Sequence, residues 1–249
     1  HVAELPVPTP ADPWHQGPFL GFDTETTGVR VREDRIVTAA LVRRTGTGPA
    51  AATTVTTWLA DPGIEIPAGA AAIHGVTTEI ARRDGRPAPD VVDEIAAHLT
   101  EAQLAGIPVV AFNAAYDLTI LDAELARYGL PTLPQRLGRP VSPVLDPLVL
   151  DRGVDRYRRG KRTLTDLCAH YGVATDDQLH RADADVVATL DVLAALVSRY
   201  AELQRQSLDE LHAWQVAKHR AWAQNFNGWL QSQGRVADVS EHWPCDPAR

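Results

Sequence analysis

The first quarter of the chain carries apolar runs that predict β-strands. Residues 19–23, FLGFD, form an apolar run that ends in an acid, which is typical of the exit of a buried strand. Residues 35–44 and 53–60 are rich in β-branched side chains and predict two further strands. Because the three strands follow one another with only turn sequences between them, we expect an antiparallel meander.

Apolar residues recur at helical spacing from residue 77 onward. In the last such segment Val186, Leu190, Leu193 and Val197 form the expected buried stripe. The spacing predicts helices over residues 77–85, 91–106, 114–130, 163–172 and 183–204, and short apolar runs predict a fourth strand at 107–113 and a fifth at 141–147. A meander followed by alternating strands and helices indicates an α/β fold, with a mixed five-stranded sheet flanked by helices.

Three regions differ in composition. Residues 1–18 contain five prolines, which block helix and central strand, so this region is expected to be an arm. Residues 19–200 hold the predicted sheet and form the expected main domain. Residues 201–249 hold four of the six tryptophans and are expected to form a C-terminal helical extension. One helical stripe of this extension would carry Leu211, Trp214, Trp222 and Trp229. We expect this stripe to dock on the protein's own core; a surface for a partner or nucleic acid is the alternative.

Charge and cysteine content narrow the classes of function. The net charge of −8 argues against a protein that holds nucleic acid by an overall positive field, but it does not exclude a nuclease whose acids bind metal ions. Six basic residues lie within positions 152–162. They form either a solvated loop or contacts to the phosphate groups of a nucleic acid. No apolar run approaches the ~18 residues that a membrane span needs. Cys168 and Cys245 lie far apart, which excludes a zinc ribbon and favours a reducing, cytoplasmic location.

Two acids stand at the exit of the first predicted strand. Asp23 and Glu25 are two positions apart, so their side chains project to the same side of a strand. Buried carboxylates are costly unless a positive group meets them. Ligation by oxygen alone favours Mg²⁺ or Mn²⁺, and a carboxylate that bridges two ions suits a two-metal site.

Further acids come from the starts of two predicted helices. Asp117 lies one turn into the helix after the fourth strand, and Asp185 opens the long helix. Asp183 is a rival ligand to Asp185. His180, five residues before Asp185, would not share a helix face with it, so we expect His180 to come from the preceding loop. A histidine in a loop can accept a proton from water near neutral pH.

The segments FDTETTG, AFNAAYDLTIL and HRADAD, in this order, resemble the three motifs of the DEDDh 3′→5′ exonucleases, relatives of the proofreading epsilon subunit of bacterial DNA polymerase III. A sister group has tyrosine where this chain has Arg181, so the histidine version fits. The resemblance implies a ribonuclease-H-like fold and a histidine general base at His180. It also implies that four carboxylates hold two Mg²⁺ or Mn²⁺ ions: Asp23, Glu25, Asp117 and Asp185.

The resemblance also implies contacts to the substrate. By analogy the backbone near Thr24 and the side chain of Thr26 meet the 3′-terminal nucleotide. His74 would be a further contact, as would Asn113 unless it only caps the helix that starts at Ala114. Asp146 could touch the site, but a turn role before the following proline is favoured.

The implied reaction is hydrolysis of phosphodiesters from a free 3′ end, with release of nucleoside 5′-monophosphates. DNA 3′ ends, single-stranded or frayed, are the expected substrate, with a polymerase or repair protein as a potential partner and no membrane. An exonuclease acting on RNA is the alternative within the family. A nucleic-acid- or polymerase-binding scaffold is the alternative of another class, and it would predict a missing carboxylate or histidine; none is missing.

Overall fold

The computed structural model describes residues 13–46, 51–175 and 181–247. Within these residues one sheet has the strand order β4-β3-β2-β1-β5-β6. Its strands are β1 (Phe19–Thr26), β2 (Ile36–Thr45), β3 (Ala52–Asp61), β4 (Arg86–Pro87), β5 (Val109–Val110) and β6 (Val144–Leu145). Strands β1, β2 and β3 form the predicted antiparallel meander, whereas β5 pairs parallel to β1, β6 parallel to β5 and β4 parallel to β3.

The sheet therefore has six strands rather than the predicted five. The additional strand, β4, pairs only Arg86 with Ala60 and the next residue with Asp61. A strand of two residues has no periodicity, so no apolar pattern could reveal it.

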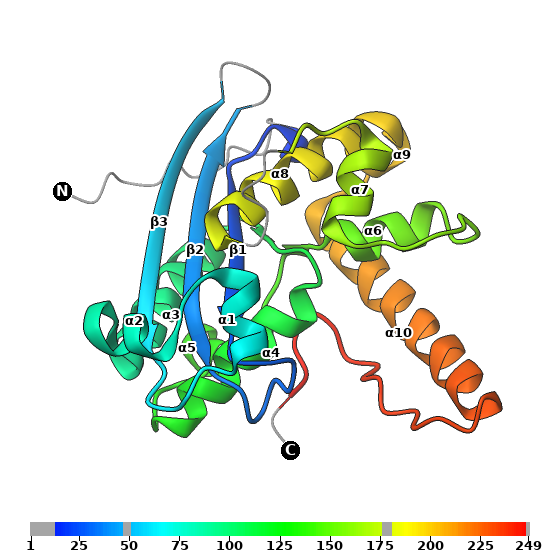
Figure 1. Cartoon of the computed structure of the whole chain (residues 1–249). Helices are drawn as coiled ribbons and strands as arrows, with labels where there is room; N and C mark the ends of the chain where they lie inside the picture. The colour runs from blue at the N-terminus through cyan, green and yellow to red at the C-terminus, as the bar shows by residue number, and fades with distance from the viewer. Residues whose placement is uncertain (1–12, 47–50, 176–180, 248–249) are drawn as a thin grey trace.

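Helices cover both faces of the sheet (Figure 1). The helices of the described residues are η1 (Trp14–Gln16, a 3₁₀ helix), α1 (Ala68–His74), α2 (Thr78–Asp84), α3 (Ala88–Leu104), α4 (Ala114–Arg127), α5 (Leu133–Leu137), α6 (Pro147–Val154), α7 (Leu164–Tyr171), α8 (Ala182–Arg199), α9 (Ala201–Gln204) and α10 (Leu208–Ser232). One core joins side chains of α3 and α4 with Phe22, and the other joins the buried stripe of α8 with Phe19 and Val42. The predicted stripe of α8 is confirmed, since all four of its residues are buried.

The C-terminal region packs against the rest of the chain. Helix α10 lies on α6 and β6, and the irregular segment after Ser232 returns to the main core, where Trp243 is buried. The predicted docking of this helix on the protein's own core is confirmed. The prediction that the tryptophan stripe forms the buried face of α10 is wrong, because Trp229 remains 49% exposed.

Two polar side chains on the buried face of α10 explain this difference. Gln215 accepts a hydrogen bond from the backbone N–H of Asp146 (2.8 Å) and donates one to the carbonyl of Val144 (2.9 Å). His219 forms a hydrogen bond to the carbonyl of Ser240. These side chains complete the backbone hydrogen bonding of β6 and of the returning segment, so polar residues take the inward positions.

Among the described residues no helix is long and apolar enough to span a membrane. Both cysteines are free thiols, with Cys168 buried and Cys245 partly buried.

Candidate active site

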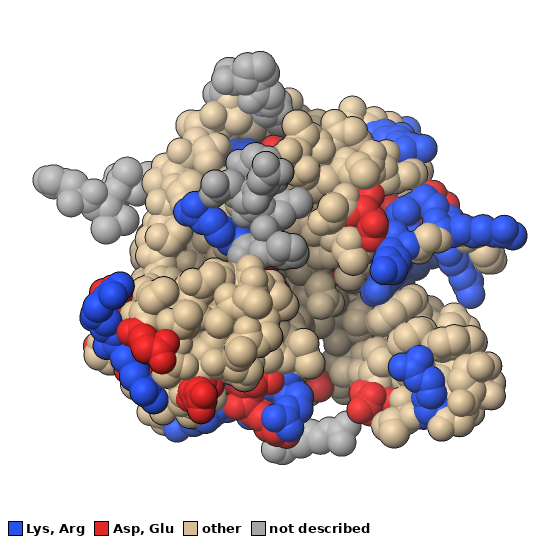
Figure 2. Space-filling view, viewed as in Figure 1, with Lys and Arg blue, Asp and Glu red and all other residues tan. Residues whose placement is uncertain are grey.

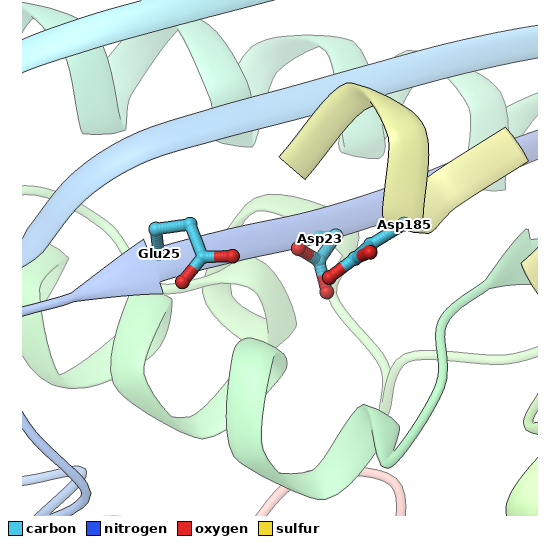
Figure 3. Close-up of side chains that lie close together, drawn as sticks. All are labelled: Asp23, Glu25 and Asp185. Carbon is cyan, nitrogen blue, oxygen red and sulfur yellow. The ribbon is translucent and has the colours of Figure 1, made fainter. Parts of the chain in front are cut away.

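Three carboxylates from two elements converge where β1 meets the start of α8. Asp23 and Glu25 project from the same side of β1, and Asp185 lies in the first turn of α8 (Figure 3). One oxygen from each of the three lies within 4.8 Å of the other two. The strand spacing predicted that Asp23 and Glu25 lie on one side, the family resemblance added Asp185, and the fold brings the three together although they are about 160 positions apart.

Gly21 sets the approach of α8 to β1. A Cβ atom at this position would lie 2.3 Å from Cγ1 of Val186 and 3.2 Å from Cδ1 of Leu190. Val186 follows Asp185 directly, so the absence of a side chain on Gly21 allows Asp185 to come close to Asp23. Helix packing and the geometry of the acid cluster are therefore coupled through one glycine.

We expect Gly21→Val to lower the rate of the nuclease reaction that the family resemblance implies far more than it lowers the stability of the fold. Overpacking costs about 1–3 kcal/mol, whereas a shift of about 1 Å in a catalytic group lowers a rate by about 10²-fold. Single-turnover rates and thermal unfolding of the variant test this expectation. A variant that folds and retains the full rate would show that the spacing of α8 and β1 does not position Asp185.

Asp117 lies beside this cluster but turns one oxygen away from it. Its Oδ1 accepts hydrogen bonds from the backbone N–H (3.0 Å) and the hydroxyl (2.6 Å) of Thr24. The negative charge of Asp117 nevertheless raises the pKa of Asp23 and of Glu25. Burial is the main cause that raises the pKa of Asp117 itself to about 7. A single α4 carboxylate thus fixes the β1 backbone between the two strand acids and adds charge to the site.

Burial and the neighbouring carboxylates disfavour the charged forms of Asp23 and Glu25. Burial raises the pKa of Asp23 well above its usual range, and Asp117, Asp185 and Glu25 add to this effect. Burial, followed by Asp185 and Asp117, raises the pKa of Glu25 to about 8. Hard divalent cations with oxygen ligands would remove this repulsion, so the donor set fits Mg²⁺ or Mn²⁺.

The metal-free protein should lose stability as pH rises. A group with a raised folded-state pKa stabilises the fold fully below its unfolded pKa and loses that contribution as pH rises through the folded pKa. For Glu25 this interval extends from about 4.5 to about 8. We expect urea unfolding in chelator to give a free energy that falls over this interval, with a smaller fall in Glu25→Gln. Parallel curves for the two proteins would contradict the raised pKa of Glu25.

A groove of about 300 Å³ adjoins the acids and is lined by Glu25, Trp58, His74, Arg181 and Asp183, among others. Burial lowers the pKa of the His74 imidazole. Its Nδ1 accepts a hydrogen bond from the backbone N–H of Val76, and a hydrogen bond to the backbone of Thr26 partly offsets the effect of burial on this pKa. His74 therefore lines the groove next to the end of β1.

The other predicted substrate contacts differ in whether their polar groups already have hydrogen-bond partners within the protein. The Thr26 hydroxyl donates to the carbonyl of Gly28 and shares a 2.5 Å hydrogen bond with Tyr116. The backbone N–H of Thr24 is already donated to Asp117. Asn113 precedes α4 with a φ of 59°, and its side chain makes no capping hydrogen bond. Its exposed amide is therefore available to a ligand, and the capping alternative is wrong.

Asp183 and Asp146 have other roles. Asp183 pairs with Arg181 at 3.2 Å and does not join the acid cluster, so Asp185, and not Asp183, is the α8 carboxylate of that cluster. Asp146 accepts hydrogen bonds from the backbone N–H groups of Leu148, Asn113 and Ala114, which confirms the favoured turn role and adds a link to α4. His180 lies outside the described residues, so its role as the general base stays a prediction.

The chain matches a known family of proteins in sequence and known structures in fold. A sequence model of the exonuclease family typified by ribonuclease T matches residues 20–193, about 70% of the chain. The chain belongs to this exonuclease family. The matched part contains all three converging acids, and the resemblance to the DEDDh exonucleases is confirmed at the level of the family. No curated protein sequence matches the chain.

Solved exonuclease structures share the fold of this exonuclease-family chain. Exonuclease I from Methylocaldum szegediense aligns with a TM-score of 0.60 and 22% identity over 75% of this chain and 41% of its own. Escherichia coli exonuclease I in complex with a dT13 oligonucleotide aligns at 0.59 and 20% identity, over 74% and 42%. Exonuclease X in complex with 5′-overhanging duplex DNA aligns at 0.55 and 20% identity, over 79% and 99%. The chain thus spans about two fifths of the exonuclease I chains.

The sequence reasoning missed one polar residue of the exonuclease site. The hydroxyl of Tyr116 donates to the carbonyl of Gly28 at 2.5 Å and contacts Thr26, and burial raises its pKa to about 12. Tyr116 thereby fixes the chain that leaves β1 after the acids. Its position directly before Asp117 was the only signal in the sequence, and no periodicity marks it.

Proposed function

We propose that this exonuclease-family chain is a metal-dependent 3′→5′ exonuclease that hydrolyses DNA from its 3′ end and releases nucleoside 5′-monophosphates. The observation that supports this most strongly is the convergence of Asp23, Glu25 and Asp185 beside Asp117. Four acids in one partly buried place have a simple chemical use as ligands of two divalent cations.

The carboxylates and His180 would have different roles in the hydrolysis of the phosphodiester. The four carboxylates would hold two Mg²⁺ or Mn²⁺ ions. Such ions, when bound, polarise the scissile phosphate and lower the pKa of the attacking water. His180 accepts a proton from that water as its oxygen attacks the last phosphorus in line. The bond from phosphorus to the 3′-oxygen breaks, this oxygen takes a proton from solvent water, and the shortened strand leaves with a 3′-hydroxyl.

Side chains around the groove would position the terminal nucleotide. The half-buried His74 lines the groove, the Thr26 hydroxyl would exchange its bond to Gly28 for one to the nucleotide, and Asn113 offers an exposed amide at the start of α4. The backbone near Thr24 is constrained by Asp117, which gives the β1 end a rigid shape against which a sugar could rest. Single-stranded or frayed 3′ ends suit a site that must enclose the last nucleotide.

We further propose that residues 19–200 form the exonuclease domain, with 1–18 as an arm and 201–249 as an extension, and that the protein works in the cytosol. The two free thiols agree with a reducing compartment. A polymerase or repair partner remains part of this proposal.

Incubation with oligonucleotides labelled at one end tests the proposal. We expect single-stranded DNA labelled at its 5′ end to give a ladder of shortening strands, and DNA labelled at its 3′ end to give only mononucleotide from the start. Mg²⁺ or Mn²⁺ should support the reaction and chelator should stop it. A faster reaction on RNA of the same sequence would assign the chain to RNA ends, and release of mononucleotide from the 5′ end would contradict the proposed direction.

A further inference from the structure

A second groove lies between the segment that follows α6 and the outer face of α10, away from the acids. Its volume is about 780 Å³. In the described part of the chain no acidic side chain lines it, whereas six cations do: Arg152, Arg156, Arg158, Lys161, Arg162 and Lys218. Figure 2 shows Lys and Arg gathered at this edge of the molecule, to the right in the view, above a hollow. We name this feature the basic groove. It stands out in a protein of net charge −8.

Two of these cations build the groove and others face solvent. Arg158 and Arg162 both bind the buried carboxylate of Asp151, the first at 2.6 Å, and Arg162 also donates to the carbonyl of Asp155. These bonds hold the loop in place. Lys161 and Lys218 are exposed and make no ion pair with any acid in the described ranges. The loop is thus ordered by internal pairs while it presents unneutralised charge.

Aromatic rings line the α10 wall of the groove and continue beyond it. Trp222 and Phe226 stack with centroids 5.5 Å apart and ring planes at 10°, and Phe226 stacks on Trp229 at 5.5 Å and 19°. The guanidinium of Arg152 lies 3.7 Å from the centre of the Trp222 ring. Burial lowers the pKa of Arg152 to about 10, so it remains cationic at neutral pH.

We propose that the basic groove binds single-stranded nucleic acid, and that it holds the strand on the 5′ side of the nucleotide being removed. Cations that follow a backbone, together with aromatic rings that stack on bases, are the two elements of binding to single strands without sequence preference. An acidic peptide would satisfy the charge but would bring no planar base to extend the stack of rings. The second half of the proposal rests on the proposed nuclease function.

The position of the groove suits a strand that leads to the acids. Helix α6, which precedes the basic loop, packs against both α8 and α10. Helix α8 carries Asp185, and α10 carries the aromatic wall. Gly153 in α6 allows this close packing, since a Cβ there would lie 2.2 Å from the Trp214 ring. Helix α6 therefore connects the helix that carries Asp185 to the wall of the groove.

Two double variants with the same change in charge test the proposal. Lys161→Glu with Lys218→Glu reverses one cation on each wall of the groove. Arg159→Glu with Arg220→Glu reverses exposed neighbours on the same loop and helix that do not line it. We measure the binding of fluorescent oligothymidylate of roughly 20 nucleotides in chelator, which prevents cleavage, over a range of salt concentrations. Thermal unfolding establishes that both variants are folded.

We expect the groove variant to lower the affinity at least about tenfold and to reduce the slope of log K against log[salt] by about 1.4, which corresponds to two lost phosphate contacts. The control variant should bind within about twofold of the unmodified protein. Equal losses in both variants, or in neither, would overturn the proposal. Binding of a deca-glutamate peptide that the groove variant abolishes, with oligothymidylate binding unchanged, would assign the groove to an acidic protein segment instead.

This measurement separates the two proposals because it needs no hydrolysis. Binding through the groove by a protein that cleaves no substrate would refute the nuclease function and leave the groove standing. Active cleavage with no effect of the groove variant would refute the groove alone.

Discussion

Asp185→Asn lowers the rate of nucleotide release by about 10³-fold or more, while Asp183→Asn, two positions away, leaves it within a few fold. Asp185 is one of the three acids whose oxygens lie within 4.8 Å of one another, whereas Asp183 pairs with Arg181 outside that cluster. A ligand to catalytic ions contributes several kcal/mol to transition-state stabilisation, and each 1.36 kcal/mol is tenfold in rate. The measurement is single-turnover cleavage of labelled DNA at saturating Mg²⁺.

Thermal unfolding supplies the control for this comparison. Asparagine has the shape of aspartate, so both variants should unfold in chelator near the temperature of the unmodified protein. Mn²⁺ at 100 times its Kd should stabilise the unmodified protein and Asp183→Asn by about 2.7 kcal/mol. Asp185→Asn should gain much less. Equal stabilisation of all three proteins, or full activity of Asp185→Asn, would remove Asp185 from the metal site.

His180→Ala is expected to lower kcat by about 10²–10⁴-fold and to leave the affinity for DNA nearly unchanged. A general base acts mainly in the transition state, so its loss affects turnover rather than binding. The acid limb of the pH profile of kcat, expected near the ordinary histidine pKa of about 6.5, should disappear with it. Stopped assays across pH 5–9, together with binding measured in chelator, separate the two quantities.

His242→Ala is the matched control for this variant, because His242 is exposed in the returning C-terminal segment. It should retain both the rate and the pH profile. A His180→Ala protein that binds DNA weakly but turns it over at the original kcat would assign His180 to substrate binding, and retention of the acid limb would assign the proton transfer to another group.

The sequence was sufficient to predict the acids because strand geometry is local. Alternation along β1 places Asp23 and Glu25 on one side, and the start of α8 was marked by its buried stripe. The meander, the alternating second half and the main helices followed from the same two periodicities. The family resemblance then connected segments whose proximity no periodicity could have shown.

Features that depend on contacts between distant segments were beyond the sequence. The binding of Asp117 to Thr24 joins residues 93 positions apart, and it gives Asp117 a structural role that its place in α4 does not reveal. The polar face of α10 is buried because Gln215 serves the backbone of β6, 69 to 71 positions earlier. Helical spacing predicted that the tryptophans face inward, because apolar periodicity reports only on apolar side chains. It does not show which backbone N–H and C=O groups of other segments need hydrogen-bond partners.

A crystal soaked in Mn²⁺, with anomalous diffraction recorded at the manganese absorption edge, tests the central claim most directly. The account predicts strong anomalous density between the carboxylates of Asp23, Glu25 and Asp185, with oxygen ligands and an ion within reach of Asp117. Crystals that hold Mn²⁺ elsewhere and show none between these oxygens would contradict it.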